Sequence, residues 1–362
     1  MNAAKQILQI SPFEPPASGW TKRIKLLRVV IEERGGVCEV LDIGPSRKIE
    51  RPGCVCVYSA SDYLKKLFRF ANQGFTFHCH INAEYFRGLL LALAACVIGR
   101  FRGNRVLTTF HGGTKQRDFE GWRRILVAPF FRAIFALSDS MICNSAAEKA
   151  LMSRYGKASK IFAIPAFSKQ YLDFSTNELE PSLESFIRNH DPIISTYLCF
   201  REGFFTETVI QAMAQLVRDW PRVGLVIVGT GDDVAAFKQK LADINISNNV
   251  YLGGDLDHSA FMTLISKSAI HLRTPITDGV SATVLEALSL RIPVVASENG
   301  NRPKSVVTYV ADNPQDLART LDVTLKNRAQ VVTALAIPQI EDTAAREVNL
   351  LFGYKDDAVA TP

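Results

Sequence analysis

The stretch AIHLRTPITDGVSATVLEALSLRIPVVAS, residues 269–297, contains one complete strand–helix–strand unit. An apolar strand over 269–274 leads into a polar loop, a helix follows Gly279, and a second apolar strand covers 292–297. Apolar strands that alternate with helices are typical of a parallel sheet covered by helices on both faces. The stretch therefore predicts an α/β fold.

Two carboxylates, Asp278 and Glu286, lie on either side of the start of this helix. The first amides of a helix are unpaired and favour an anion such as a diphosphate, and Gly279 lets the backbone approach it closely. A carboxylate at Glu286 can accept two hydrogen bonds from a ribose diol, and Asp278 can accept them from the hydroxyls of a sugar. The alternative is that Asp278 caps the helix and Glu286 is a solvated surface residue. The apolar neighbours of Glu286 in VLEALSL favour a protected position, and hence a nucleotide-sugar site.

The same alternation extends in both directions along the chain. The expected strands of the first half lie at 37–43, 54–60, 75–80, 105–112, 140–145 and 160–167, with helices near 20–34, 84–99, 121–137 and 145–154. Strands at 193–200, 224–231 and 249–254, each followed by a helix, precede the opening stretch. Two doubly wound parallel sheets are therefore expected, with their ligand crevices at the carboxyl ends of the strands.

The length of 362 residues indicates two domains. We expect a Rossmann-like acceptor-side domain at 1–168, a polar, proline-containing linker at 169–192 and a second Rossmann-like domain that binds the nucleotide sugar at 193–340. The remaining residues, 341–362, form an amphipathic helix and tail that could pack back on the first domain. Two such domains facing each other would make one deep cleft for the ligands.

Charge is distributed unevenly along the chain. Residues 1–170 carry 26 Lys and Arg against 12 Asp and Glu, although the whole chain has a net charge of only +6. A basic first half suggests an anionic partner. No zinc finger or RNP-like motif supports nucleic acid, whereas basic and apolar residues interleave over 121–135 as in a helix that lies on anionic lipid. The alternative for 121–135 is a core helix whose arginines reach the solvent.

The seven cysteines are scattered, without a C-x-x-C pair, which favours a reduced cytosolic protein over a disulfide or zinc scaffold. The first residues contain no signal-peptide core, and the longest apolar run, 88–99, is too short to cross a bilayer. The expected location is therefore cytoplasmic, peripheral at the inner face of the membrane.

The segment TDGVSATVLEALSLRIPVVAS, residues 277–297, resembles the signature of glycosyltransferase family 4, the retaining nucleotide-sugar enzymes of GT-B fold. The Asp-Gly-x-Ser at 278–281 is similar to a variant branch of the family, because the first acid of the signature is usually Glu. Arg291 stands where the family usually has Gly. Shorter similarities follow in the family's order, among them TFHGG at 109–113 and LVIVGTGDD at 225–233.

The resemblance implies a role for each matching residue. Glu286 would hold the nucleotide ribose, Asp278 the donor sugar beside the reacting carbon, and His111 the same sugar from the opposite wall. The remaining donor-binding residues implied are Arg201, Arg273, Gly279, Val280, Ser281, Gly19, Gly112 and Gly113. The loop CFREGFFTE, 199–207, has aromatic residues in place of the usual Lys-Gly, so diphosphate binding there is in question.

Other signals have simpler explanations. Asp255 and Asp257 match a manganese-binding pattern but open a helix, so capping accounts for them and no metal or other cofactor is expected. Gly229 and Gly231 follow a strand, but the third glycine of a dinucleotide fingerprint is replaced by Val234.

The sequence thus predicts a retaining glycosyltransferase of the hexosyltransferase type, acting in cell-surface polysaccharide biosynthesis. It would move a sugar from a nucleoside diphosphate sugar to a glycan or lipid-linked acceptor. Two alternatives remain: a degenerate GT-B protein that binds nucleotide or glycan without turnover, and a GT-B-type sugar-nucleotide epimerase.

Overall fold

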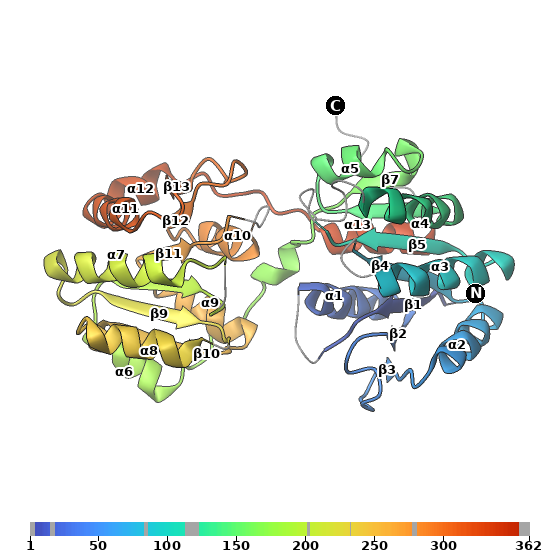
Figure 1. The fold of residues 1–362 in the computed structure, drawn as a ribbon, viewed down its shortest axis with the longest axis horizontal. Helices are drawn as coiled ribbons and strands as arrows, with labels where there is room; N and C mark the ends of the chain where they lie inside the picture. Colours follow the sequence, from blue (N-terminus) through green and yellow to red (C-terminus); the bar gives the residue numbers. More distant parts are fainter. Residues whose placement is uncertain are drawn as a thin grey trace. The chain divides into compact units, whose positions relative to one another are not determined.

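The structure is a computed structural model that describes residues 4–14, 19–82, 86–112, 123–200, 203–231, 233–276 and 281–354, with the side chains of 123 and 124 excepted. The chain divides into two compact units. Unit 1 comprises Met1–Gln170 together with Glu341–Pro362, and unit 2 comprises Tyr171–Ile340. Each unit is built around its own parallel sheet (Figure 1).

Unit 1 contains a seven-stranded sheet in the order β3-β2-β1-β4-β5-β6-β7, in which every pair is parallel. Its strands are β1 (Gln6–Ser11), β2 (Val37–Asp42), β3 (Cys54–Val55), β4 (Thr76–Ile81), β5 (Val106–Phe110), β6 (Ser140–Cys143) and β7 (Ile161–Ala163). The order reverses between β1 and β4, as in a doubly wound fold.

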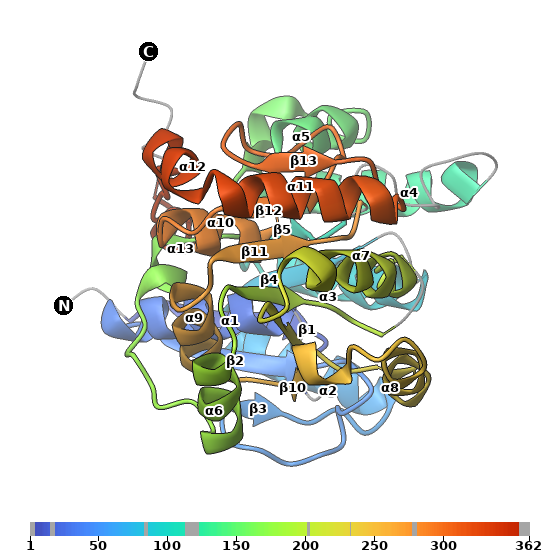
Figure 2. The same ribbon diagram turned by 90° about the vertical axis from the view of Figure 1, so that its left-hand side faces the viewer.

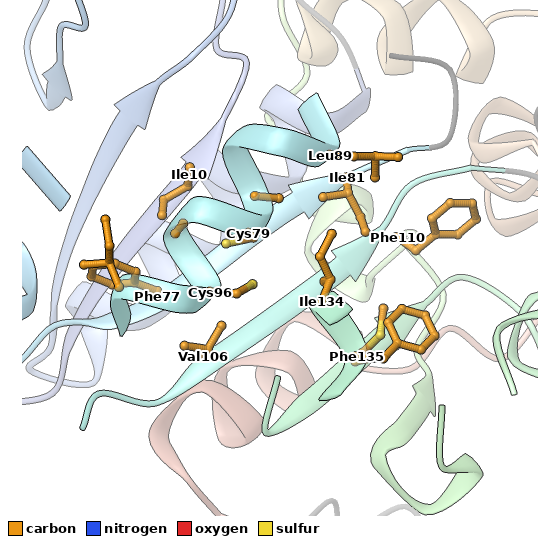
Figure 3. Close-up of a cluster of buried hydrophobic side chains, with 14 of the residues drawn as sticks. Ile10, Phe77, Cys79, Ile81, Leu89, Cys96, Val106, Phe110, Ile134 and Phe135 are labelled. Atoms are coloured by element: carbon orange, nitrogen blue, oxygen red, sulfur yellow. The ribbon is translucent and has the colours of Figure 1, made fainter. Parts of the chain in front are cut away.

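Helices cover both faces of this sheet. On one face, α2 (Ala60–Asn72), α3 (Phe86–Phe101) and α4 (Arg123–Leu137) pack on the largest core of the unit. Figure 3 shows Cys96 of α3 close to Cys79 of β4 in that core, which also contains Leu89 of α3. A cysteine in such an apolar contact behaves as a small hydrophobic residue, and a side-chain hydrogen bond with Cys96, together with burial, raises the pKa of Cys79.

The opposite face is covered by two helices from the two ends of the chain. Helix α1 (Gly19–Glu33) and helix α13 (Thr343–Phe352) share a core with β1, β5 and β6. Helix α13 is therefore part of unit 1, although the whole of unit 2 precedes it in the sequence. The remaining helix, α5 (Ala146–Met152), follows β6 and contacts β7.

Unit 2 contains a six-stranded parallel sheet in the order β10-β9-β8-β11-β12-β13. Its strands are β8 (Ile193–Tyr197), β9 (Gly224–Val228), β10 (Val250–Gly254), β11 (Ile270–Arg273), β12 (Val294–Ser297) and β13 (Val307–Tyr309). The 269–297 stretch forms β11, α10 (Ala282–Ser289) and β12, so the strand–helix–strand prediction is confirmed.

The helices of unit 2 also form two layers (Figure 2). Helices α7 (Thr206–Asp219), α8 (Val234–Asp243) and α11 (Pro314–Lys326) enclose one core. Helices α6 (Pro181–Asn189), α9 (His258–Ser266) and α10 enclose the other. The last helix, α12 (Arg328–Ala334), follows α11.

The segment expected as a linker, 169–192, contains a short 3-10 helix and then α6. Leu179 and Leu183 of this segment are buried in the core that α9 and α10 enclose, so most of the segment is part of unit 2. Within the described residues, no helix is both long enough and apolar enough to cross a membrane.

Candidate functional site

The candidate nucleotide site of unit 2 lies where the order of its strands reverses. Strands β8 and β11 are neighbours, but their following connections cross the sheet in opposite directions. In an open parallel sheet, the crevice at the carboxyl ends of two such strands is the usual ligand position. The described residues that follow β8 and β11 at this edge are 198–200 and 203–205 after β8, and 274–276 and Ser281 after β11.

Two glycines after β9 allow its loop to pack directly on the loop after β8. A Cβ at Gly229 would lie 2.3 Å from the Leu198 carbonyl oxygen, and Gly229 has a φ of +128°. A Cβ at Gly231 would lie 2.7 Å from the Phe200 carbonyl oxygen and 2.8 Å from its nitrogen. This close backbone contact explains the Gly229-x-Gly231 pattern without a dinucleotide.

The end of β11 is fixed to the loop after β8 by polar contacts. Arg273 Nη1 donates to the Tyr197 carbonyl oxygen at 3.3 Å, and the Arg273 guanidinium lies over the Phe204 ring at 5.9 Å. Thr274 Oγ1 donates to the Phe204 carbonyl oxygen at 2.7 Å. Arg273 is therefore a half-buried cation at the reversal point, held at the end of its strand.

Glu286 lies on α10 and is only 5% exposed, which confirms that this carboxylate is protected. Its Oε1 is 3.8 Å from Nδ1 of His258, the first residue of α9, and His258 Nε2 is 2.8 Å from the Tyr171 carbonyl oxygen. Ser281 occupies the N-cap position of α10 but makes no side-chain capping hydrogen bond. Glu286 is thus a buried acid that lies about one turn after the start of α10.

A buried histidine connects this helix to the sheet. His271 of β11 has Nδ1 3.2 Å from Ser195 Oγ of β8 and Nε2 3.0 Å from Thr283 Oγ1 of α10. Burial lowers the pKa of His271 to about 3, so the ring is neutral at pH 7. A neutral ring bridging two hydroxyls fixes the first turn of α10 relative to the reversal point.

Asp257 caps α9, because its carboxylate accepts a hydrogen bond from the Ala260 amide at 2.8 Å. This is the explanation that the sequence favoured over a manganese site. Across the described parts of the chain, no group of three His, Cys, Asp or Glu side chains could hold a metal ion.

In unit 1, three histidines lie together on β4 and at the end of β5. His80 Nδ1 is 2.7 Å from His111 Nε2, and His80 Nε2 is 2.7 Å from Oε1 of Gln9 on β1. Trp20 of α1 stacks on His111, with ring centroids 4.6 Å apart. His78 and His80 also contact each other, at 4.2 Å between centroids. The two histidines of β4 therefore share one cluster with His111.

This arrangement fixes the tautomer of His111. Burial lowers the pKa of His111 to about 3 and the pKa of His80 well below its usual value, so both rings are neutral at pH 7. With the Gln9 amide oxygen facing His80, the hydrogen-bond network assigns a proton to His80 Nε2 and leaves its Nδ1 as an acceptor. His111 then donates through Nε2, and its Nδ1 can accept a hydrogen bond from a hydroxyl.

Behind this cluster lies a buried ion pair. Arg23 of α1 donates to Oε2 of Glu347 on α13 through Nε at 2.9 Å and through Nη2 at 2.6 Å. Oε1 of Glu347 accepts from Thr109 Oγ1 at 3.3 Å and lies 3.6 Å from His78 Nε2. Arg23 holds the pKa of Glu347 below its usual value although burial opposes this shift.

Some predicted site residues can be placed and others cannot. Asp278, Gly279, Val280, Arg201 and Gly113 lie outside the described residues. The described ones are divided between the units: Glu286, Arg273 and Ser281 belong to unit 2, and His111, Gly112 and Gly19 belong to unit 1.

The two glycines of unit 1 in this set differ in their surroundings. Gly112 is buried beside His111. Gly19 begins α1, and a Cβ there would have no described neighbour within 4 Å, so packing does not require a glycine at this position.

Three polar residues near these sites were missed from the sequence. His258 and His271 had no visible partners along the chain, because their contacts come from other elements. Gln9 lies on β1, a strand that the sequence reasoning did not predict. The HxH spacing of His78 and His80 was the one available signal, since strand alternation places both on one face.

Residues 206–334 match the family model "Glycosyl transferases group 1". An uncharacterised glycosyltransferase of Methanocaldococcus jannaschii is 27% identical over 99 residues, which are 27% of this chain and 24% of that protein. Poly(glycerol-phosphate) alpha-glucosyltransferase of Bacillus subtilis is 29% identical over 99 residues, 27% of this chain and 14% of that protein. The matched stretch thus spans a quarter or less of the length of these curated relatives.

Solved structures resemble the chain over almost its whole length. HepE of Anabaena in complex with UDP has a TM-score of 0.66 and 14% identity, covering 96% of this chain and 99% of that one. Sucrose-phosphate synthase of Thermosynechococcus elongatus has a TM-score of 0.63 and 17% identity, covering 96% and 99%. A protein from Listeria monocytogenes described as a putative UDP-N-acetylglucosamine 2-epimerase has a TM-score of 0.65 and 14% identity, covering 98% of each chain. The chain therefore has the GT-B fold.

Proposed function

We propose that this protein is a retaining glycosyltransferase that moves a sugar from a nucleoside diphosphate sugar to a glycan or lipid-linked acceptor. The observation that carries the proposal is the buried carboxylate of Glu286 on α10, the helix that His271 connects to the two strands at the reversal of unit 2. This helix lies within the residues that match the glycosyl transferases group 1 model. A buried acid at that place suits a ribose diol.

The proposed roles follow the family resemblance. Glu286 holds the ribose, while Arg273 and Arg201 neutralise the diphosphate. Asp278 and His111 contact the donor sugar. Transfer passes through an oxocarbenium-like state as the diphosphate leaves, and preorganised donors stabilise that leaving charge by about 3–4 kcal/mol for each good donor. The amides of α10 and the arginines supply such donors, so we propose no metal and no other cofactor.

The proposed donor is a uridine diphosphate sugar, and the proposed sugar is a hexose. HepE, which shares the fold, is described in complex with UDP-glucose. We further propose a role in cell-surface polysaccharide biosynthesis. The location proposed is cytoplasmic, with peripheral binding of the basic N-terminal domain to the anionic inner face of the membrane and no nucleic-acid partner.

Two rival functions deserve a direct test. The loop 199–207 lacks the usual Lys-Gly, which favours a degenerate protein that binds nucleotide without turnover. The similarity in fold to an epimerase favours a sugar-nucleotide epimerase. Product analysis separates the three functions: transfer requires an acceptor, epimerisation proceeds without one, and a degenerate protein gives no product.

Thermal unfolding with UDP, GDP, ADP and their sugar conjugates tests the donor site. A nucleotide at about 100 times its dissociation constant adds ~2.7 kcal/mol to the free energy of unfolding, and we expect this shift with UDP. Glu286→Ala and the isosteric Glu286→Gln should both lose it. Glu184→Gln removes a partly exposed carboxylate of unit 2 that pairs with Lys267, and it should keep the full shift. Absence of a shift with every nucleotide would contradict the proposed function.

A further inference from the structure

Unit 1 has a cavity that none of the proposed donor-site residues line. Its volume is about 210 Å³, roughly the share of seven water molecules in the liquid. It lies where β2 and β3 end and α2 and the first turns of α3 begin. The lining residues are Ile43, Arg47, Val57, Ser59, Ala60, Tyr63, Arg87 and Leu91.

The cavity combines two guanidinium groups with an apolar floor. Arg47 comes from the loop after β2 and donates through Nη1 to the Gly44 carbonyl oxygen at 3.2 Å, which fixes its position. Arg87 comes from the first turns of α3, one turn before Leu91. Val57 and Tyr63 are almost fully buried beneath them. Two guanidinium groups around a small cavity suit a phosphate, because each can donate two hydrogen bonds to its oxygens.

An acid beside this cavity, Asp62, is already paired with a lysine. Asp62, in the first turn of α2, is 2.7 Å from Lys66 Nζ and accepts a hydrogen bond from the Tyr58 amide. The side chain of Ser59 caps the Asp62 amide at 3.1 Å. The cationic character of Arg47 and Arg87 is therefore not cancelled by this carboxylate.

An exposed apolar stripe runs away from the cavity along α3. The residues Phe86, Leu90, Val97 and Phe101 recur at intervals of four and seven positions on the exposed side of the helix, whereas Leu89 and Cys96 are buried in the core drawn in Figure 3. All four are exposed, and Phe101 is 80% exposed.

The neighbouring helices extend this surface on both sides. Helix α2 adds Leu64 and Phe68, and α4 adds Ile125, which is 71% exposed, and Leu126. Exposed apolar side chains gathered on α3 and on the two helices that pack against it are typical of an interaction site. The helices α2, α3 and α4, which lie side by side in Figure 1, carry eight Lys and Arg and a single Asp in their sequences.

We propose that the cavity binds the phosphate headgroup of an anionic lipid, while the apolar stripe of α3 enters the bilayer surface. The charge of the three helices selects an anionic surface, and the apolar side chains between the basic ones suit the boundary between headgroups and acyl chains. Arg87 serves both parts, because it lines the cavity and lies next to Phe86 on the same helix. The inference rests on the proposed function in taking the protein to work at a membrane surface.

Sedimentation with vesicles tests this site on the full chain. We expect binding to vesicles that contain phosphatidylglycerol and little binding to phosphatidylcholine alone. Arg87→Gln should weaken binding about fivefold and Arg47→Gln with Arg87→Gln about 25-fold, at about fivefold for each basic residue near the surface. Arg218→Gln removes an exposed charge from α7 of unit 2 and should change binding less than twofold. Equal effects of Arg87→Gln and Arg218→Gln would overturn the proposal.

A second pair of variants separates a lipid from a soluble phosphate. Leu90→Ser with Phe101→Ser should weaken vesicle binding, whereas Val323→Ser, an exposed apolar position on α11, should not. If instead the Leu90 and Phe101 changes have no effect and glycerol 3-phosphate alone stabilises the protein, the ligand is a soluble phosphate ester and the lipid assignment fails. Stabilisation by UDP, measured on the same variants, reports the donor site separately, so failure of one proposal is distinguishable from failure of the other.

Discussion

His80 is placed to orient His111 without itself reaching a substrate. It accepts the His111 Nε2 proton and is held in turn by Gln9, so its removal should release the ring of His111. We expect His80→Leu to lower the rate of donor turnover about 10- to 100-fold, as losses of supporting hydrogen bonds do at other sites. Steady-state kinetics with the donor that stabilises the protein would measure this.

The controls for His80 lie in the same cluster. His78→Gln alters an equally buried neighbour that bonds to Thr109 rather than to His111, and it should affect turnover much less. Adding His80→Leu to His111→Ala should cause no further loss, because two residues that act as one unit are not additive. A further large loss in the double variant would show that His80 acts in some other way.

At the scale of elements, the contact between the loops after β8 and β9 depends on Gly229. Gly229→Ala combines a φ of +128° with a Cβ placed against the Leu198 carbonyl, so the backbone at Leu198 must shift. We expect a loss of about 1–3 kcal/mol in the free energy of unfolding and weaker nucleotide binding. Gly253→Ala, where the nearest neighbour of a Cβ is at 3.5 Å, is the matched control in chemical unfolding.

The Arg23–Glu347 pair joins the first helix of unit 1 to the last. Breaking a buried pair leaves one uncompensated charge, so Glu347→Met should cost about 3–5 kcal/mol of stability in unit 1. Replacing both partners by Met should cost less, because no isolated charge is then buried. Urea unfolding of the two single variants and the double variant measures the coupling, and additive losses would contradict this account.

Some strands could be predicted from the sequence and others could not. The 269–297 stretch could be predicted because β11 and β12 are almost entirely buried and most of their residues are apolar. Strand β1 was missed because two of its buried residues, Gln9 and Ser11, are polar. Gln9 can be buried because His80, 71 residues away in the chain, supplies its hydrogen bond. The local pattern of apolar and polar residues does not reveal such long-range contacts.

The features of the candidate sites also divide into those that the sequence could predict and those that it could not. The protection of Glu286 could be predicted from its apolar neighbours in α10. The contacts of His258 and His271 could not, because they join residues from different strands and helices. The apolar stripe of α3 was also missed, since an apolar helix in sequence does not reveal which of its residues the sheet leaves uncovered.

At the scale of the whole molecule, buried histidines make both units sensitive to acid. Burial lowers the pKa of His78 to about 4 and the pKa of His111 and His271 to about 3. Below the ordinary histidine pKa of about 6.5, the unfolded chain takes up protons that the folded chain does not. The free energy of unfolding should therefore fall as the pH falls from 6.5, by about 2 kcal/mol for each histidine at pH 5.

The lowered pKa of Glu347 acts with the same sign in unit 1, because its contribution is lost as the pH falls through its folded-state value. Hydrogen–deuterium exchange at pH 7 and pH 5 would measure the stability of each unit separately, after correction for the intrinsic exchange rate. His271→Asn should reduce the pH dependence in unit 2 and leave that of unit 1 unchanged. Equal stability at the two pH values would contradict the lowered pKa values.

Because α13 belongs to unit 1 but follows unit 2 in the sequence, the two units cannot be completed in chain order during translation. Arg23 is synthesised 324 positions before its partner Glu347, so unit 2 emerges complete while unit 1 still lacks its last helix. At about 5–20 residues per second, that interval lasts roughly 16 to 65 seconds. The nascent first unit therefore holds a lone arginine in its interior, or delays closing around it, until α13 has been synthesised.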